Sequence, residues 1–216
     1  MVLNDILIGF GIAFSVIIVL IILVFGIAYP FFKKKYMYRN FKNIYYKKVK
    51  AICDINDYYL INKLVVTNKK TIICRIDHVI FSNKYIYVIK DRYYNGAISG
   101  DKEDAAWIFY NSKGEKQEIP NPMNVNTMRI DKLAKITNID LSFFISIVLI
   151  NNDAVIKNPK DLNSKSSFIT STKRLKRLIS SIEKRDIKNI DPVKLEYAVH
   201  DIYKLYGKGR EIDGEE

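Results

Sequence analysis

The sequence has few of the residues that build metal sites or disulfide frameworks. Its 216 residues include two cysteines, Cys53 and Cys74, and two histidines, His78 and His200. Structural zinc sites draw their ligands from closely spaced cysteine and histidine pairs, and these four residues show no such spacing. Two cysteines fit a reduced, cytosolic domain better than a disulfide-stapled secreted one. We therefore expect neither a structural zinc site nor a disulfide framework.

Charge is missing from one long stretch near the N-terminus. Residues 6–29 contain no charged side chain and are almost wholly apolar. As a helix rising about 1.5 Å per residue, this stretch would span roughly 36 Å, more than the ~30 Å of a bilayer core. A cleaved signal peptide is the competing interpretation, but no basic segment precedes the run, the run is too long and no small-residue cleavage site follows it. The stretch predicts an N-terminal transmembrane anchor over residues 1–32.

Carboxylates are missing from the next stretch. No acidic residue lies between Asp5 and Asp54, whereas residues 33–50 contain eight basic side chains. Because no Lys or Arg precedes the apolar run, the positive-inside rule predicts a single-pass protein with its N-terminus outside and its domain in the cytoplasm. Residues 33–39 form a basic juxtamembrane segment that suits anionic lipid. The basic side chains that we expect to contact lipid or nucleic acid here are Lys33, Lys34, Lys35, Lys47, Lys48 and Lys50.

The rest of the chain alternates apolar runs with helix-start and turn signals. Residues 40–207 predict one domain, followed by an acidic tail over residues 208–216. Asn121-Pro122 and Asp191-Pro192 each place a capping side chain before a proline, which is typical of a helix start. We expect an α/β (α+β) fold with a mixed central sheet flanked by helices. The expected strands cover residues 58–66, 71–81, 85–89, 96–100, 105–110, 118–119, 143–150 and 166–169, and the expected helices start near Asn40, Pro122, Ser171 or Thr172, and Pro192, the last ending at Gly207.

Two of these expected strands carry charge at informative positions. Asp77 is surrounded by isoleucine and valine in the first, where burying an unpaired carboxylate costs several kcal/mol. The second ends in Lys90-Asp91-Arg92, and alternation along a strand puts Lys90 and Arg92 on one face and Asp91 on the other. If the two strands are neighbours, Asp77 and Lys90 converge on one edge of the sheet.

Three motifs in this region resemble those of a known family. They read Ile76-Asp77-His78-Val79, Val88-Ile89-Lys90-Asp91-Arg92 and Gly96-Ala97-Ile98-Ser99-Gly100, and Trp107 and Asn121-Pro122 follow. In order and spacing they resemble the NERD (nuclease-related) domain, a member of the PD-(D/E)xK nuclease-like fold, whose motifs read I-D-H-V, V-I-E-x-K and G-x-I-x-G. The resemblance covers roughly residues 40–205 and implies a PD-(D/E)xK-like domain.

The same resemblance implies a degenerate site. A PD-(D/E)xK nuclease holds Mg²⁺ with two carboxylates and positions water with a lysine. Asp77 retains the first ligand, but Lys90 replaces the second carboxylate and Arg92 replaces the lysine. The glutamate on the preceding helix of active members has no counterpart, and Val125 occupies the position of their glutamine after N-P. We expect a vestigial site in which Asp77 pairs with Lys90, with no metal and no cofactor.

Three functions remain open from the sequence. The first is a catalytically inactive, membrane-anchored protein that binds nucleic acid or a protein partner. The second is a divergent nuclease in which Asp77 and Asp91 hold Mg²⁺ after a bulge rotates the strand end. The third is a membrane-surface scaffold with no nucleic-acid role, and the oligomeric state is open in all three. For Trp107 we expect core packing rather than base stacking. A second basic run is either a solvated helix face or a phosphate contact, and it comprises Lys173, Arg174, Lys176 and Arg177.

Overall fold

The computed structural model describes residues 2–68, 71–157 and 162–213, which form two compact units, residues 1–41 and 42–216. Helix α1 (Val2–Asn56) makes up the first unit and continues into the second. Large apolar side chains from Phe14 to Phe32 are exposed along it. Within the described part of the chain, α1 is the one helix long and apolar enough to cross a membrane.

The separate helix expected from Asn40 is not present, because α1 is continuous through that position. No glycine or proline occurs between Phe31 and Asn56 to interrupt it. The Asn40 side-chain amide donates to the carbonyl of Tyr36, one turn earlier, at 3.0 Å instead of capping a new helix.

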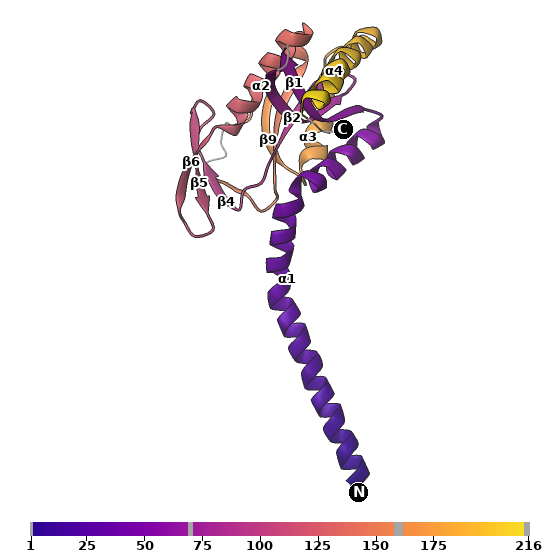
Figure 1. Cartoon of the computed structure of the whole chain (residues 1–216), viewed down its shortest axis with the longest axis vertical. Helices are drawn as coiled ribbons and strands as arrows, with labels where there is room; N and C mark the ends of the chain where they lie inside the picture. Colours follow the sequence, from indigo (N-terminus) through magenta and orange to yellow (C-terminus); the bar gives the residue numbers. More distant parts are fainter. Residues whose placement is uncertain (1, 69–70, 158–161, 214–216) are drawn as a thin grey trace. The chain divides into compact units, whose positions relative to one another are not determined.

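The second unit is built on a mixed five-stranded sheet in the order β1-β2-β3-β7-β9 (Figure 1). Strands β1, β2 and β3 pair antiparallel, and β3, β7 and β9 pair parallel. Every residue of β7 is buried, as its uninterrupted apolar run predicts for a central strand. The bounds are β1 (Tyr59–Asn68), β2 (Thr71–Phe81), β3 (Ile86–Arg92), β7 (Phe144–Ile150) and β9 (Ser167–Ser171).

A smaller sheet in the order β6-β5-β4-β8 lies to one side of the main sheet (Figure 1). The sequence predicts all of its strands except β8, which is three residues long and pairs parallel with β4. The bounds are β4 (Gly96–Ser99), β5 (Ala106–Asn111), β6 (Lys116–Pro120) and β8 (Val155–Lys157). The predicted mixed α/β fold with helices around a mixed sheet is confirmed.

Helices cover the main sheet. α2 (Pro122–Thr137) and α4 (Pro192–Asp213) bury Leu133 and Ile202 in a core with Val88 of β3. The end of α1 packs against His78, on which the ring of Tyr46 stacks with centroids 6.3 Å apart. The remaining helices are the short 3₁₀ turn η1 (Leu141–Phe143) and α3 (Leu175–Glu183).

Two helix starts are confirmed, and one expected cap and one expected helix end are corrected. The side chain of Asn121 accepts from Met123 N at 3.0 Å, and Asp191 caps α4 in the same way. No side chain caps α3, and Thr172, one of its expected caps, donates to Asn152 instead. Helix α4 passes through Gly207 and Gly209 to Asp213, because each glycine costs a helix only about 1 kcal/mol. Most of the expected acidic tail is therefore helical, and residues 214–216 lie outside the described residues.

Candidate functional site

The two central strands separate at one point. Strand β2 pairs with β1 from Phe81 to Thr71, but it pairs with β3 only from Phe81 to His78. Beyond His78, β2 stays with β1, while β3 continues along β7 to Arg92. A notch therefore opens between β2 and β3, and Asp77 and Lys90 stand on its two edges.

Asp77 and Lys90 converge across this notch, as strand alternation predicts. The Lys90 ammonium lies 2.6 Å from Asp77 Oδ2, and the side chains are 11% and 16% exposed respectively. The backbone N–H of Asp91 donates to the same oxygen at 3.0 Å. Burial lowers the pKa of Lys90, and the neighbouring Asp77 opposes this shift without cancelling it. The ammonium thus occupies one oxygen of the carboxylate that would otherwise be a metal ligand.

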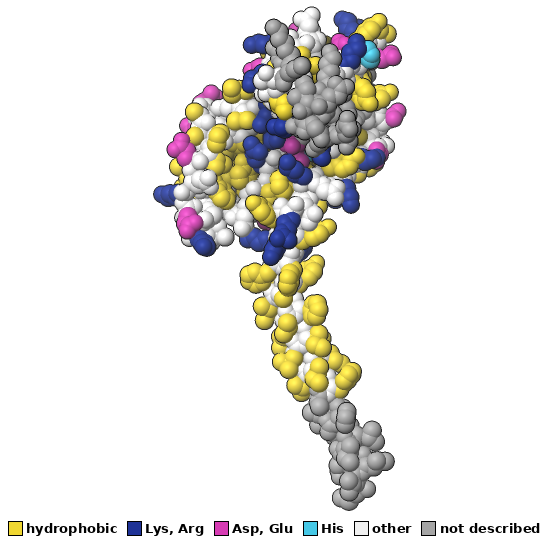
Figure 2. Space-filling view, viewed as in Figure 1, with side chains coloured by type: hydrophobic (Ala, Val, Ile, Leu, Met, Phe, Trp, Pro, Cys, Tyr) yellow, Lys and Arg dark blue, Asp and Glu magenta, His cyan; other side chains and the backbone are white. Residues whose placement is uncertain are grey.

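Two arginines add positive charge to the notch. Burial lowers the pKa of Arg129, and Arg92 lowers it further by like-charge repulsion. Arg92 and Arg129 also contribute to the lowered pKa of Lys90, so the three cations share one environment around Asp77. Arg129 Nη1 is buried and has no hydrogen-bond partner among the described residues. In Figure 2, basic side chains gather in the middle of the visible face of this unit with an acidic one among them.

Arg129 was not identified from the sequence. It follows Val125 by one helical turn on α2, so the position that the family fills with glutamine and the arginine share one side of the helix. Asn126 does not replace the glutamine, because it is buried and donates to Val88 O and Ser146 Oγ, each at 3.0 Å. That side chain joins α2 to β3 and β7, and α2 contributes a cation to the notch in place of an amide.

A second acid–base pair lies on the other side of the sheet. His78 Nε2 and Asp91 Oδ2 are 3.0 Å apart, and the two side chains are only 2% and 1% exposed. Burial raises the pKa of Asp91, and its hydrogen bond with His78 opposes that shift. His78 Nδ1 and Asp91 Oδ1 are both buried without a hydrogen-bond partner among the described residues. The sequence analysis did not foresee this pair.

The pairing of Asp91 differs from the geometry that the divergent-nuclease hypothesis needs. That hypothesis needs a bulge that rotates Asp91 toward Asp77. Strand β3 instead keeps a regular register with β7 through Lys90, Asp91 and Arg92. The Asp91 carboxylate therefore lies against His78, and the two carboxylates do not form a shared site.

A cavity of about 620 Å³ adjoins the His78–Asp91 pair. Helix α1 faces it with Lys42, Asn43 and Tyr46, so no carboxylate replaces the helix glutamate of active family members. Lys47, Lys48 and Lys50 are exposed and do not line the cavity, and Lys50 pairs with Asp54 one turn on. The other lining residues come from the strands and are Asn62, Lys63, Val65, Arg75, Ile76, Asp77, His78 and Asp91.

These residues do not fit a magnesium ion. Mg²⁺ binds oxygen ligands in a near-octahedral shell, and the family supplies two carboxylates for it. At the notch the donor set is one carboxylate that already accepts from Lys90, and Arg92 and Arg129 would repel a divalent cation. No group of three His, Cys, Asp or Glu residues is placed to hold a metal within residues 2–68, 71–157 and 162–213.

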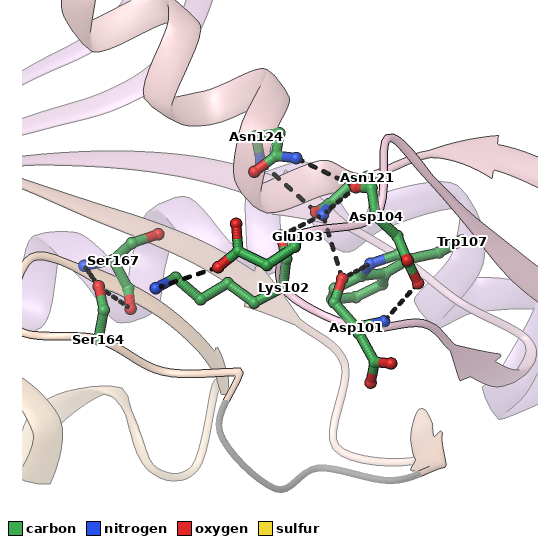
Figure 3. Close-up of polar contacts among 9 residues, drawn as sticks. All are labelled: Asp101, Lys102, Glu103, Asp104, Trp107, Asn121, Asn124, Ser164 and Ser167. Carbon is green, nitrogen blue, oxygen red and sulfur yellow. Dashed lines mark hydrogen bonds and ion pairs between the residues drawn. The ribbon is translucent and has the colours of Figure 1, made fainter.

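The remaining motif residues have structural roles. Trp107 is 1% exposed, and its Nε1 donates to Asp101 O at 2.8 Å, as core packing predicts (Figure 3). A Cβ atom on Gly100 would lie 2.1 Å from the indole Cδ1, so only glycine fits there. The Asn121 amide donates to Asp104 O at 2.8 Å and fixes the same loop to the start of α2. These side chains hold the smaller sheet in place, and Trp107 offers no surface to a base.

The second basic run lies at the start of α3. Its four cations are exposed, while Leu175 between them is buried. None of them lines the 620 Å³ cavity. The run is Lys173, Arg174, Lys176 and Arg177.

The split strands with Asp77 and Lys90 at their edges, followed by the crossover to α2, define a nuclease-like domain. The model of the nuclease-related domain (NERD) family matches residues 38–151, more than half of the chain. The chain belongs to the NERD family. No curated protein and no solved structure matches it.

Proposed function

We propose that this NERD protein is anchored in the membrane, with its domain in the cytoplasm, and that it binds nucleic acid without metal-dependent cleavage. The observation that carries the proposal is the 2.6 Å contact between Lys90 Nζ and Asp77 Oδ2. An ammonium at this position takes the place of both the second carboxylate and the metal ion that it would hold.

The same charges favour a phosphate. Mg²⁺ would have to displace Lys90 and bind a single carboxylate beside two arginines, at a high electrostatic cost. Without the metal, the chain lacks the usual means of activating water for hydrolysis. Lys90, Arg92 and Arg129 nevertheless leave the notch with excess positive charge around Asp77. Cations of this kind bind the nucleic-acid backbone without reading its sequence.

Binding and cleavage are measured on the full chain in nanodiscs of zwitterionic lipid. DNA should bind without sequence preference and lose affinity steeply as salt rises. Arg129→Gln should weaken binding and reduce the salt slope by about one, whereas Lys47→Gln, outside the notch, should have a smaller effect. No cleavage is expected with Mg²⁺ or Mn²⁺. Mg²⁺-dependent cleavage that Asp77→Ala abolishes would refute the proposal.

A lipid-surface scaffold is the second candidate, favoured by the eight basic side chains of residues 33–50. Vesicles containing anionic lipid test it beside DNA at the same salt concentration. Vesicle binding by the domain with no DNA binding, even at low salt, would favour the scaffold and reject the nucleic-acid proposal.

Orientation is tested separately. A cysteine replacing Leu3, in a chain with Cys53 and Cys74 changed to serine, should react with an impermeant maleimide in intact cells, because no positive charge precedes the apolar helix. Protection of that cysteine, with labelling of one placed near the C-terminus, would reverse the orientation.

A further inference from the structure

A second cavity lies at the start of β3, toward the opposite end of that strand from Arg92. Its volume is about 520 Å³, and its walls come from the end of α2, η1 and the first half of α4. None of the notch residues lines it, so this cavity is separate from the site that the family motifs define. Its apolar lining residues are Ile86, Ile139, Phe143, Ile190, Leu195 and Ala198.

Tyr197 of α4 lies at the rim of this cavity. Its side chain lines the cavity and is nevertheless 66% exposed, so the ring does not fill the cavity. Val193, one helical turn earlier, is 57% exposed. The outer face of a surface helix is normally polar, and tyrosine is enriched where proteins contact each other. An exposed aromatic ring beside an apolar cavity therefore indicates a protein contact.

The charges on either side of Tyr197 indicate the kind of partner. Lys194 lies three residues before it and Asp201 four residues after it, and both are exposed and line the cavity. Positions three and four apart share one face of a helix, so these residues form a stripe with the tyrosine between opposite charges. Asp201 Oδ1 is 3.9 Å from His200 Nδ1, beyond hydrogen-bonding distance, so the carboxylate remains available to a partner.

This order of charges complements itself when two α4 helices meet antiparallel. A two-fold axis between Tyr197 and Ala198 puts Tyr197 opposite the partner's Ala198, a small residue of the partner's cavity. The same axis puts Lys194 opposite the partner's Asp201, because each lies three positions outside the central two residues. A parallel pair of helices would instead place lysine against lysine. The stripe therefore fits a second copy of this chain.

We propose that the chain forms a two-fold symmetric dimer through α4, in which Tyr197 of each copy enters the partner's cavity and Lys194 pairs with the partner's Asp201. Each copy supplies the same stripe and the same cavity, as a closed two-fold contact requires. The inference goes beyond the proposed function and does not depend on it, because no residue of the notch takes part in the contact.

Disulfide cross-linking of the full chain in vesicles of zwitterionic lipid tests the geometry. Copies with Lys194→Cys are reconstituted together with copies with Asp201→Cys and oxidised. The mixture should form linked dimers, because the two cysteines face each other and the second lysine–aspartate pair is retained. Either variant alone should link far less, since equal positions lie about 10 Å apart along the paired helices. The wild type measures any linkage through Cys53 and Cys74. Linkage in each variant alone as strong as in the mixture would overturn the antiparallel contact.

Charge reversal tests the affinity, measured by energy transfer between C-terminal fluorescent fusions as the protein-to-lipid ratio rises. Lys194→Glu and Asp201→Lys should each weaken the dimer about tenfold or more, because each replaces two attractions by two repulsions. The double reversal should restore most of the affinity, and Tyr197→Ala should lose it without rescue. Glu196→Lys, exposed on another side of α4, is the matched control and should behave as the wild type.

Two results would overturn the proposal. A wild type that stays monomeric would leave the cavity to a small apolar molecule or to a different protein. A dimer that none of these substitutions weakens would show that the copies pair elsewhere, for example through the apolar part of α1.

Discussion

Two acid–base pairs occupy successive positions on β2 and β3, and they differ in almost every physical respect. Asp77 and Lys90 form the notch pair, which is partly exposed and receives a further hydrogen bond from Asp91 N. His78 and Asp91 form the inner pair, which lies against α1, is nearly fully buried and leaves one polar atom of each residue unpaired. Both pairs use the same two strands, and only the alternation of side chains separates them.

The comparison shows how one strand pair can place two different acid–base pairs on the two faces of a sheet. At the notch, Lys90 forms an ion pair with Asp77, and Arg92 and Arg129 add further positive charge. The inner pair is incomplete, because His78 Nδ1 and Asp91 Oδ1 have no hydrogen-bond partner among the described residues. The two pairs therefore differ in how completely their polar atoms are satisfied, although both lie on the same two strands.

The largest effect that we expect comes from breaking the inner pair. His78→Ala leaves the Asp91 carboxylate buried without a partner, which should lower the free energy of unfolding by about 3–5 kcal/mol. Denaturant unfolding followed by the fluorescence of Trp107, the one tryptophan and a buried one, measures this loss. His200→Ala is the control, since His200 is exposed beside Asp201. This substitution should change the free energy of unfolding by less than about 1 kcal/mol. Equal effects of the two substitutions would show that the inner pair is not stabilising.

The notch pair should tolerate change better, because solvent reaches it. Asp77→Ala should lower the free energy of unfolding by about 2 kcal/mol, and Lys90→Met by a similar amount. This loss is smaller than the one expected when a fully buried pair loses one partner. The double variant should cost less than the sum of the two, with a coupling of about 0.5–3 kcal/mol, because neither charge is then left alone. Strict additivity in this cycle would mean that Asp77 and Lys90 do not stabilise each other.

The fold could be predicted where local patterns decide it. The apolar run of β7, the alternation in β2 and β3 and the Asn-Pro and Asp-Pro caps all act within a few residues of their own positions. The predictions failed where an element depends on contacts with residues that are distant in the sequence. Strand β8 exists because β4 pairs with it, and α4 continues past Gly207 although that glycine is a typical helix end. No residue between 31 and 56 ends the helix between the apolar stretch and the domain, and α1 is continuous there.

The candidate site could be predicted only in part, for the same reason. Asp77 and Lys90 were paired from alternation and strand order, which the sequence contains. Arg129 was missed because the side of α2 that faces the sheet depends on how the helix packs. The inner pair was missed because it requires the register between β2 and β3, in which His78 lies opposite Ile89, one residue before Lys90 and two before Asp91.

A substitution at position 90 sharpens the comparison by making the notch resemble the family site. Lys90→Glu should destabilise the metal-free domain through repulsion from Asp77 and then recover stability in Mg²⁺. Binding to the folded state alone adds about 1.4 kcal/mol when Mg²⁺ is at ten times its Kd. Thermal melts with and without Mg²⁺ measure the gain.

The controls for this experiment are the wild type and Lys90→Gln, which removes the positive charge without adding a carboxylate. Neither should respond to Mg²⁺ beyond a general salt effect, matched with NaCl of equal ionic strength. A wild-type melting temperature that rises with Mg²⁺ as much as that of Lys90→Glu would mean that Asp77 binds the metal despite Lys90.

The smallest effect that we expect is a change in the pH dependence of stability. Burial raises the pKa of Asp91, so the folded state takes up its proton more readily than the unfolded state does. Stability from this group is therefore fully present below the unfolded pKa of about 4 and is lost as pH rises through the raised folded pKa. Asp91→Asn keeps the shape of the side chain and cannot titrate. Its free energy of unfolding, minus that of the wild type, should therefore increase as pH rises from about 4 toward neutrality. Unfolding curves at constant ionic strength measure the difference, in which groups that titrate alike in both proteins cancel. A difference that stays constant or falls over this range would show that burying the ionised Asp91 carboxylate beside His78 does not lower the free energy of unfolding.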